Sequence, residues 1–423
     1  MSGVDRRGCN VTGATPAALE AYERALAAHQ SWHEGVKELV SVALQEAPTF
    51  VMAHVLRAWG LVCSRDPRQV NAARPLLALA NDLPANDRER LHLAALAAVV
   101  GDDYESAKAQ LGEALRVQPR DILALQAAHA LDYLTGDTAR MKDRVKAVLP
   151  AWSNDLPGYH AVLAMHAFSL EECGAYPEAE QAARSALALN RDDARAHHVM
   201  AHVFEMTGRA YEGARWMYEH LGGWGVGTIV ATHCWWHVSL FHLAQGRHDV
   251  ALALYDRQIR ARRSSEVADL IDAASLLWRV EVAGGEAGKR WVELASAWST
   301  HVDDGFCSFS DVHAMLAFVG GRRWDLARRL ELALFKAQSL ATRYGETTRQ
   351  VGLPACRALI AFGHGNDTVA MKLIRSFRRL VHRLGGSHAQ RDVLHVALFG
   401  AIDHDRRPAR WLAAAQSPSA ARA

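Results

Sequence analysis

The chain has 423 residues, half of them hydrophobic, which is ample apolar material for a folded protein. A single core rarely grows to this length, so we expect either several domains or one elongated array. Lys and Arg number 48 against 46 for Asp and Glu, and this balance argues against binding that depends on bulk positive charge. We therefore expect no nucleic-acid partner and no membrane partner.

The N-terminal segment 1–14 carries no apolar core of the kind that a secretory signal requires, and we expect it to be disordered. No stretch of the chain reaches the ~18 apolar residues that a membrane span needs. The six cysteines lie far apart without a C-x-x-C pair, which is typical of reduced thiols. These features predict a cytoplasmic protein.

Residues 15–404 show apolar side chains at three- and four-residue spacing, which predicts helices nearly throughout. A turn that contains glycine recurs along this region at intervals of 34 to 38 residues. Such a period indicates stacked helical hairpins, each made of a helix A and a helix B. The turn glycines are Gly101, Gly136, Gly174, Gly208, Gly246, Gly284 and Gly320.

In five of these hairpins a small residue follows a glycine of the turn by five or six positions, at Ala107, Ala179, Gly213, Ala251 and Ala327. Glycine accepts the left-handed conformation that ends helix A, and the small residue lets helices A and B approach closely. One hairpin cannot bury its apolar face alone, so neighbouring hairpins stack. The predicted fold is an all-α, tetratricopeptide-like α-solenoid of eight to ten helical hairpins in a right-handed superhelix. We expect residues 15–404 to form one domain and 405–423 a C-terminal tail.

Several segments carry motifs that the repeat pattern does not explain, and these motifs resemble the tetratricopeptide repeat protein 38 family. The resemblance covers roughly residues 20–400. It implies an all-helical repeat fold and carries no assigned activity. Cys234 stands where the family has Asn. The segments that carry the resemblance are 158–180, 197–209, 233–256, 269–285, 309–318 and 385–392.

Seven histidines fall on the predicted A helices, which line the inner wall of a tetratricopeptide-like superhelix. Counting back from the turn glycines places them near one continuous concave surface. We therefore predict that His166, His198, His233 and His313 are ligand-binding residues. The seven are His129, His166, His198, His202, His233, His237 and His313.

Two of these A helices each carry an H-x-x-x-H pair, and residues four apart share one helical face. His198 and His202 form the first pair, and His233 and His237 form the second on the next A helix. Two such helices that face each other can present imidazoles to a zinc or iron ion. The alternative is that the histidines hydrogen-bond neighbouring helices as a polar seam.

The same groups allow a reaction without a metal. A neutral His202 beside Glu205 can act as a general base, because the ordinary pKa of histidine lies near neutral pH. His237 and Asp272 are the other candidate catalytic residues. Asp272 interrupts an apolar helix, and a buried carboxylate needs a partner, either Arg279 or a histidine of the preceding hairpin. Asp269 is either an N-cap or a first-turn acid.

The segment 385–392, "GGSHAQRD", contains a capping box in which Ser387 pairs with Gln390. His388 and Arg391 then either bind a carboxylate or phosphate at the helix N-terminus, or Arg391 forms a surface salt bridge with Asp392.

A glycine-rich stretch precedes the predicted helix of His233, and three tryptophans lie in and around these two segments. Trp224, Trp235 and Trp236 are either core residues or an apolar wall beside the histidines, and we count Trp236 among the candidate ligand-binding residues. We read 221–228, "LGGWGVGT", as a flexible loop, because it lacks the G-K-[ST] of a phosphate-binding loop.

Two functions remain open. The first is a solenoid that binds a small molecule or a peptide segment in a concave pocket lined by His, Glu, Asp and Trp. The second is an enzyme that acts on a small molecule through the same His, Glu and Asp residues, with or without a metal ion. We favour binding, because tetratricopeptide-like arrays usually bind partners, and we leave a homodimer open.

Overall fold

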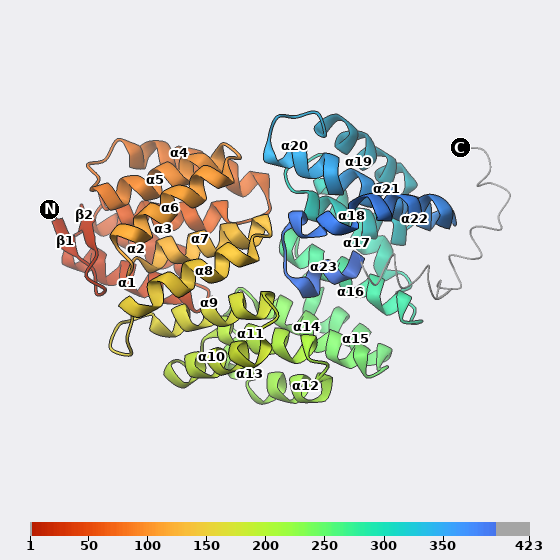
Figure 1. Ribbon diagram of the computed structural model, residues 1–423, viewed down its shortest axis with the longest axis horizontal. Helices are drawn as coiled ribbons and strands as arrows, with labels where there is room; N and C mark the ends of the chain where they lie inside the picture. Colours follow the sequence, from red (N-terminus) through yellow and green to blue (C-terminus); the bar gives the residue numbers. More distant parts are fainter. Residues whose placement is uncertain (1, 395–423) are drawn as a thin grey trace. The chain divides into compact units, whose positions relative to one another are not determined.

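The computed structural model describes residues 2–394. Its only strands in that range are two short ones, β1 (Ser2–Val4) and β2 (Asn10–Thr12), which pair antiparallel. Consecutive α-helices make up nearly all the rest and pack as hairpins, such as α5 with α6 and α9 with α10 (Figure 1). The all-α, tetratricopeptide-like prediction is confirmed. The predicted tail, 405–423, lies outside the described residues.

We expected one domain over 15–404, but the described chain divides into two compact units. The first unit runs to Gly208 and also includes Arg215–Cys234, while the second contains Arg209–Ala214 and the described residues from Trp235 onward. One division falls in the turn just before α12 (Ala210–Glu219), and the other two fall inside α12 and inside α14 (Ala231–Ala244).

The helices of the first unit follow one another from the N-terminal hairpin onward. They are α1 (Pro16–Gln30), α2 (Val36–Glu46), α3 (Val51–Val62), α4 (Pro67–Asn81), α5 (Asp87–Val100), α6 (Tyr104–Val117), α7 (Ile122–Thr135), α8 (Thr138–Val148), η1 (Leu149–Ala151), α9 (Tyr159–Glu172), α10 (Tyr176–Leu189), α11 (Ala194–Met206) and α13 (Leu221–Trp224).

The second unit repeats the hairpin pattern, with short 3₁₀ and π segments between helices. Its elements are α15 (His248–Leu254), η2 (Tyr255–Ile259), α16 (Val267–Val282), α17 (Arg290–Trp298), η3 (Ser299–His301), α18 (Ser308–Gly320), α19 (Trp324–Ala337), α20 (Arg343–Thr347), η4 (Thr348–Gly352), α21 (Leu353–Gly363), α22 (Asp367–Phe377), η5 (Arg378–Leu384) and α23 (His388–Leu394).

Most of the predicted turn glycines take the left-handed backbone conformation that ends helix A, as Gly136 does with φ of 73°. Two turns differ, because Gly101 has a negative φ and Gly320 lies within α18. The left-handed position there belongs to Asp102 (φ 62°) and Arg322 (φ 54°). A Cβ at position 320 would lie 2.6 Å from the ring of Trp291, so this glycine serves close packing of α17 against α18.

The prediction that 1–14 is disordered is wrong for the described residues 2–14. Cys9 and Val11 are fully buried, and the backbone N–H of Thr12 donates to Glu89 Oε1 at 2.8 Å. Arg88 donates to the carbonyl of Asn10 at 2.7 Å and thereby ties β2 to α5. The segment is ordered because its polar backbone finds charged partners on the helices beneath it.

The A helices are buried on nearly every side, unlike helices that line an open groove. In α11, every residue from Ala194 to Phe204 is buried, and in α18 all residues are buried. A helix that is buried all round has neighbours on its inner face as well. Among the described residues, none of the helices combines the length and apolar character that a membrane span requires.

Candidate functional site

The strongest cluster of ionisable side chains in the first unit is built on α11. Its N-cap, Asp193, accepts hydrogen bonds from the backbone N–H groups of Arg195 (3.0 Å) and Ala196 (3.3 Å). This cap sets the start of the helix and so the direction in which each later side chain points. Arg195, His198 and His202 then share one face at spacings of three and four residues.

The histidines of this face meet a third histidine from α14. His198 Nε2 and His202 Nε2 lie 3.0 Å apart, and each of His198, His202 and His233 offers a ring nitrogen within 4.8 Å of the others. The ring centroids of His198 and His233 are 5.0 Å apart. His198 and His202 are buried, whereas His233 is partly exposed. The structure therefore brings together three of the four predicted metal ligands within the first unit.

The fourth predicted ligand, His237, follows His233 by one turn of α14. It is fully buried and belongs to the second unit, which begins at Trp235. The ring of Trp236 packs against it at a centroid distance of 4.8 Å. Trp224 and Trp236 are fully buried and Trp235 is nearly so, which fits core residues and equally fits a wall beside the histidines.

Two buried glutamates of α9 complete the cluster, and the sequence analysis missed both. Glu171, Glu172 and His202 each offer a ligand atom within 4.8 Å of the others. Glu171 Oε2 lies 3.6 Å from His202 Nδ1. Glu205, the carboxylate predicted beside His202, is half-buried and lies outside this described group. The sequence does hold one indication of a buried carboxylate here, because Glu171 interrupts the apolar pattern of the helix that precedes Gly174.

Aromatic side chains enclose the imidazoles. The ring of Phe168 on α9 lies 5.4 Å from that of His202 and 5.7 Å from that of His198. Trp32, in the connection between α1 and α2, lies 5.4 Å from His198. The cluster thus has apolar walls, which strengthen electrostatic interactions inside it.

The glycine-rich stretch 221–228 is not a flexible loop as predicted. Residues Leu221–Trp224 form the one-turn helix α13, and the backbone around Gly227 pairs with the connection between α1 and α2. Glu34 N donates to the carbonyl of Gly227, and Ile229 N donates to the carbonyl of Trp32, both at 2.9 Å. These bonds hold Trp32 in its left-handed conformation (φ 59°) over α11.

Arg195 adds a buried positive charge one turn before His198. Its guanidinium lies 4.4 Å from the centre of the Trp32 ring, and its Nε donates to the carbonyl of Gln30 at 3.3 Å. Burial lowers the pKa of Arg195 to about 10. Burial, followed by the charge of Arg195, also lowers the pKa of His129 on α7 to about 3.

His166 and His129 lie on neighbouring A helices, and neither takes part in the cluster of imidazoles that His198 and His202 of α11 form. His129 Nε2 bonds the carbonyl of Met165 at 3.1 Å, as a seam between α7 and α9. His166 is half-buried, and burial lowers its pKa. Neither residue belongs to the described groups of ligand atoms around His202. The polar-seam reading therefore fits His129.

The remaining predicted site residues belong to the second unit. Asp272 and His313 are buried on α16 and α18, and His313 Nδ1 bonds the carbonyl of Phe309 at 2.8 Å. Arg279, named as a partner for Asp272, donates to Ser275 Oγ and to the carbonyl of Ala389. Burial raises the pKa of Asp311, which accepts a hydrogen bond from Tyr344 at 3.0 Å, to about 7.

The predicted capping box at the start of α23 is confirmed. Gln390 N donates to Ser387 Oγ at 3.2 Å, and Ser387 N donates to Gln390 Oε1 at 3.4 Å. Arg391 is buried and donates to the carbonyl of Gly386. Burial lowers the pKa of His388. Arg391 therefore holds the turn before α23.

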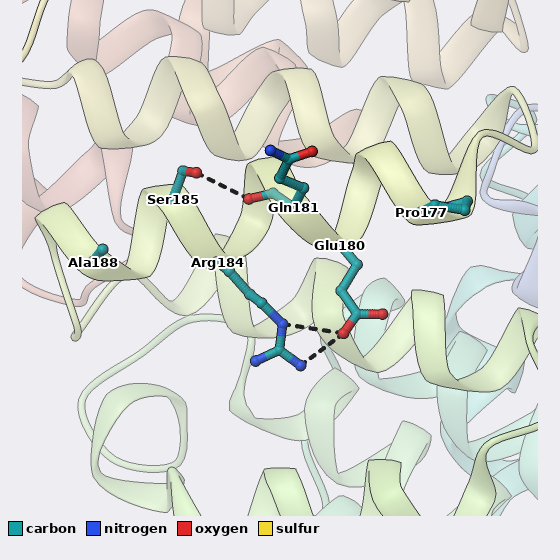
Figure 2. Close-up of a pocket in the computed structure, with 6 residues that line it drawn as sticks. All are labelled: Pro177, Glu180, Gln181, Arg184, Ser185 and Ala188. Carbon is teal, nitrogen blue, oxygen red and sulfur yellow. Dashed lines mark hydrogen bonds and ion pairs between the residues drawn. The ribbon is translucent and has the colours of Figure 1, made fainter.

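A surface depression on α10 lies apart from all of these residues (Figure 2). Its side chains come from one face of one helix, where Arg184 donates to Glu180 Oε1 at 2.7 and 3.1 Å. No predicted site residue lines it, so we regard it as helix surface. The lining residues are Pro177, Glu180, Gln181, Arg184, Ser185 and Ala188.

No protein-family model matches the chain. Among solved structures it is similar to a human IFIT1 dimer with m7Gppp-AAAA, with a TM-score of 0.41 and 13% identity over 98% of this chain and 96% of that chain. It is also similar to the TPR domain of P58(IPK), with a TM-score of 0.24 and 14% identity over 82% and 89% of the two chains. At these values neither likeness says anything about the ligand or activity of this chain.

Proposed function

We propose that this tetratricopeptide-like protein binds a transition-metal ion in its first unit and uses that ion to hold a small-molecule ligand. The observation that carries the proposal is the convergence of ring nitrogens from His198, His202 and His233 within 4.8 Å. Three protein ligands with room for one more are the usual arrangement of a zinc site that accepts an exogenous group.

The spacing of the imidazoles suits such an ion. Ligands 2.0–2.1 Å from a tetrahedral zinc are roughly 3.3 Å from each other. His198 Nε2 and His202 Nε2 are 3.0 Å apart, so small rotations of the side chains reach that geometry. The third nitrogen, on His233, lies on a partly exposed residue that has more freedom to adjust.

The surrounding carboxylates support the same proposal. A metal-bound histidine usually has a carboxylate or carbonyl at its other ring nitrogen, which fixes the ring and raises its basicity. Glu171 Oε2 stands 3.6 Å from His202 Nδ1 and supplies this partner.

Glu172 favours a second candidate function, a metal-dependent enzyme acting on a small molecule. Glu172 is buried and groups with Glu171 and His202, so it can take up a proton near the ion. The histidine-bearing motifs in 158–180, 197–209 and 233–256 lead us to propose, further, that the chain is related to the tetratricopeptide repeat protein 38 family.

The test is the metal content of the purified protein. We expect about one zinc or iron ion per chain by elemental analysis, and its loss in His202→Gln. His197→Gln is the matched control, because His197 is equally buried on α11 and bonds the carbonyl of Arg191 at 2.9 Å. The proposal is overturned if the folded wild-type protein still holds less than about a tenth of an ion per chain after incubation with zinc, iron or cobalt.

A further inference from the structure

Arg195 is a buried cation that forms no ion pair with a carboxylate of residues 2–394, although the charge of Asp193 acts on it from a distance. Only 4% of the residue is exposed, and its Nη2 atom has no hydrogen-bond partner in the described part of the chain. The nearest acid in sequence, Asp193, already caps α11 and accepts from His160 Nδ1 at 2.7 Å. Burying a charge is costly unless it is paired, so Arg195 is placed to receive an anion.

A second donor lies beside it. Arg195 Nε donates to the backbone carbonyl of Gln30, and the side-chain Nε2 of that same Gln30 is buried with no partner among the described residues. Gln30 is 2% exposed. Arg195 Nη2 and Gln30 Nε2 are thus both buried N–H groups that lack an acceptor in the described part of the chain, and a carboxylate, with two acceptor oxygens, is the group that a guanidinium binds most strongly.

This donor pair is continuous with the histidine cluster. The guanidinium of Arg195 and the imidazole of His198 both pack against Trp32, at 4.4 and 5.4 Å. Along α11 the rise from residue 195 to residue 198 is about 4.5 Å, and to residue 202 about 10.5 Å. A ligand of a few bonds therefore spans from Arg195 to the imidazole nitrogens.

We propose that Arg195 and Gln30 form a carboxylate-binding subsite beside the histidines of α11, and that the ligand is a small carboxylic acid whose other end reaches the metal ion. The metal end of this ligand rests on the proposed function, whereas the carboxylate end rests on Arg195 alone. Trp32 packs against Arg195 and against His198 and so lines both ends of the site, and its partly exposed edge is the side from which a ligand enters.

A carboxylate fits better than a phosphate group. One guanidinium supplies a single positive charge, which balances a carboxylate but not a phosphate dianion. The nearby buried Gln126 Oε1 is an acceptor without a described partner, and Gln126 Nε2 donates to the carbonyl of His29, next to Gln30. An acceptor at this end repels an extra negative oxygen but can receive a hydroxyl or amino group of the acid.

The experiment is calorimetric titration of the full-length protein, with and without zinc, using succinate, malate, glutamate and inorganic phosphate as probes. We expect at least one carboxylate to bind, and Arg195→Met to weaken it at least about tenfold while the zinc content stays unchanged. Arg195→Lys is expected to recover part of the affinity. Arg184→Met, which removes an exposed arginine from α10, is the matched control.

The outcomes separate the two proposals. Equal carboxylate affinity in wild type and Arg195→Met overturns the subsite, and so does binding of phosphate but of no carboxylate. Zinc binding is measured separately on the same samples. If zinc is absent while carboxylate binding still depends on Arg195, the proposed metal function fails and the subsite stands. If zinc binds and no carboxylate does, the subsite fails and the metal function stands.

Discussion

His198 Nε2 and His202 Nε2 face each other at 3.0 Å in the interior of the first unit, where both residues are buried. In the protein alone, one of these nitrogens must donate its proton to the other. In the proposed site a metal ion would take the place of that shared proton, and its binding should weaken in acid, where protonated imidazoles cannot coordinate it.

Glu171→Gln should weaken metal binding without removing it. The carboxylate lies behind His202 Nδ1 at 3.6 Å, and loss of such a partner typically lowers metal affinity by about 10–100-fold. Competition with a chelating dye measures the change. Glu180→Gln, on the outer face of α10, should leave the affinity unchanged, and an equal effect of both substitutions would contradict the assigned role of Glu171.

The stability of the fold should fall as the pH drops below about 6.5, partly through His129. Its pKa is lowered to about 3 in the folded protein, by burial first and by Arg195 second, while the unfolded chain keeps the ordinary value of about 6.5. Between these values the unfolded chain binds more protons, so stability rises with pH through this window and is fully present above about 6.5.

His129→Gln tests this dependence. Relative to wild type, we expect the loss of unfolding free energy between pH 7.5 and pH 5 to shrink by on the order of 2 kcal/mol. Urea unfolding at the two pH values gives the comparison, and only the difference between them matters, because the substitution also changes packing. A variant whose loss between the two pH values equals that of wild type would refute the assignment.

Asp121→Asn should destabilise the first unit strongly. Asp121 accepts from Arg88 at 2.8 Å and from His92 Nε2 at 2.9 Å, and all three residues are buried. Burial alone would raise the pKa of Asp121, but Arg88 and His92 hold it below its ordinary range. Removing one partner of a buried pair costs about 3–5 kcal/mol.

The N-terminal hairpin should report the same change locally. Arg88 also donates to the carbonyl of Asn10. Because Asp121→Asn removes the carboxylate that holds the Arg88 side chain in place, amide hydrogen exchange in residues 2–12 should rise. Glu113→Gln, which breaks an exposed pair with Arg116 on α6, is the control and should cost under about 0.5 kcal/mol. Unchanged exchange in the hairpin would show that another contact orders it.

Arg322→Gly should stabilise the second unit. Arg322 is left-handed at φ of 54°, a conformation that costs a non-glycine residue about 1–2 kcal/mol. Glycine loses more backbone entropy on folding, so the net gain should be about 1 kcal/mol or less, measured as an increase in unfolding free energy. Gly136→Ala, at φ of 73° in the first unit, is the opposite substitution and should destabilise.

The sequence alone determined the features that depend on neighbours along the chain. Helical periodicity and the turn glycines specified the hairpins, and the i,i+4 spacing specified that His198 and His202 share a face of α11. The capping box of Ser387 and Gln390 was readable for the same reason, since its partners lie within one turn. Even there, the left-handed residue moved to Asp102 and Arg322 in two turns, and in the second of them the close packing of Gly320 against Trp291 competes with the cap.

Only the tertiary structure decided which groups meet across helices. Glu171 stands behind His202, and Trp32 lies over Arg195 from a connection more than 150 residues earlier in the chain. No local pattern encodes such pairs, because they arise from the packing of side chains between separate helices. The order of residues 2–14 has the same origin. Arg88 and Glu89 on α5 and Glu23 on α1 order this segment, and these partners all lie outside it.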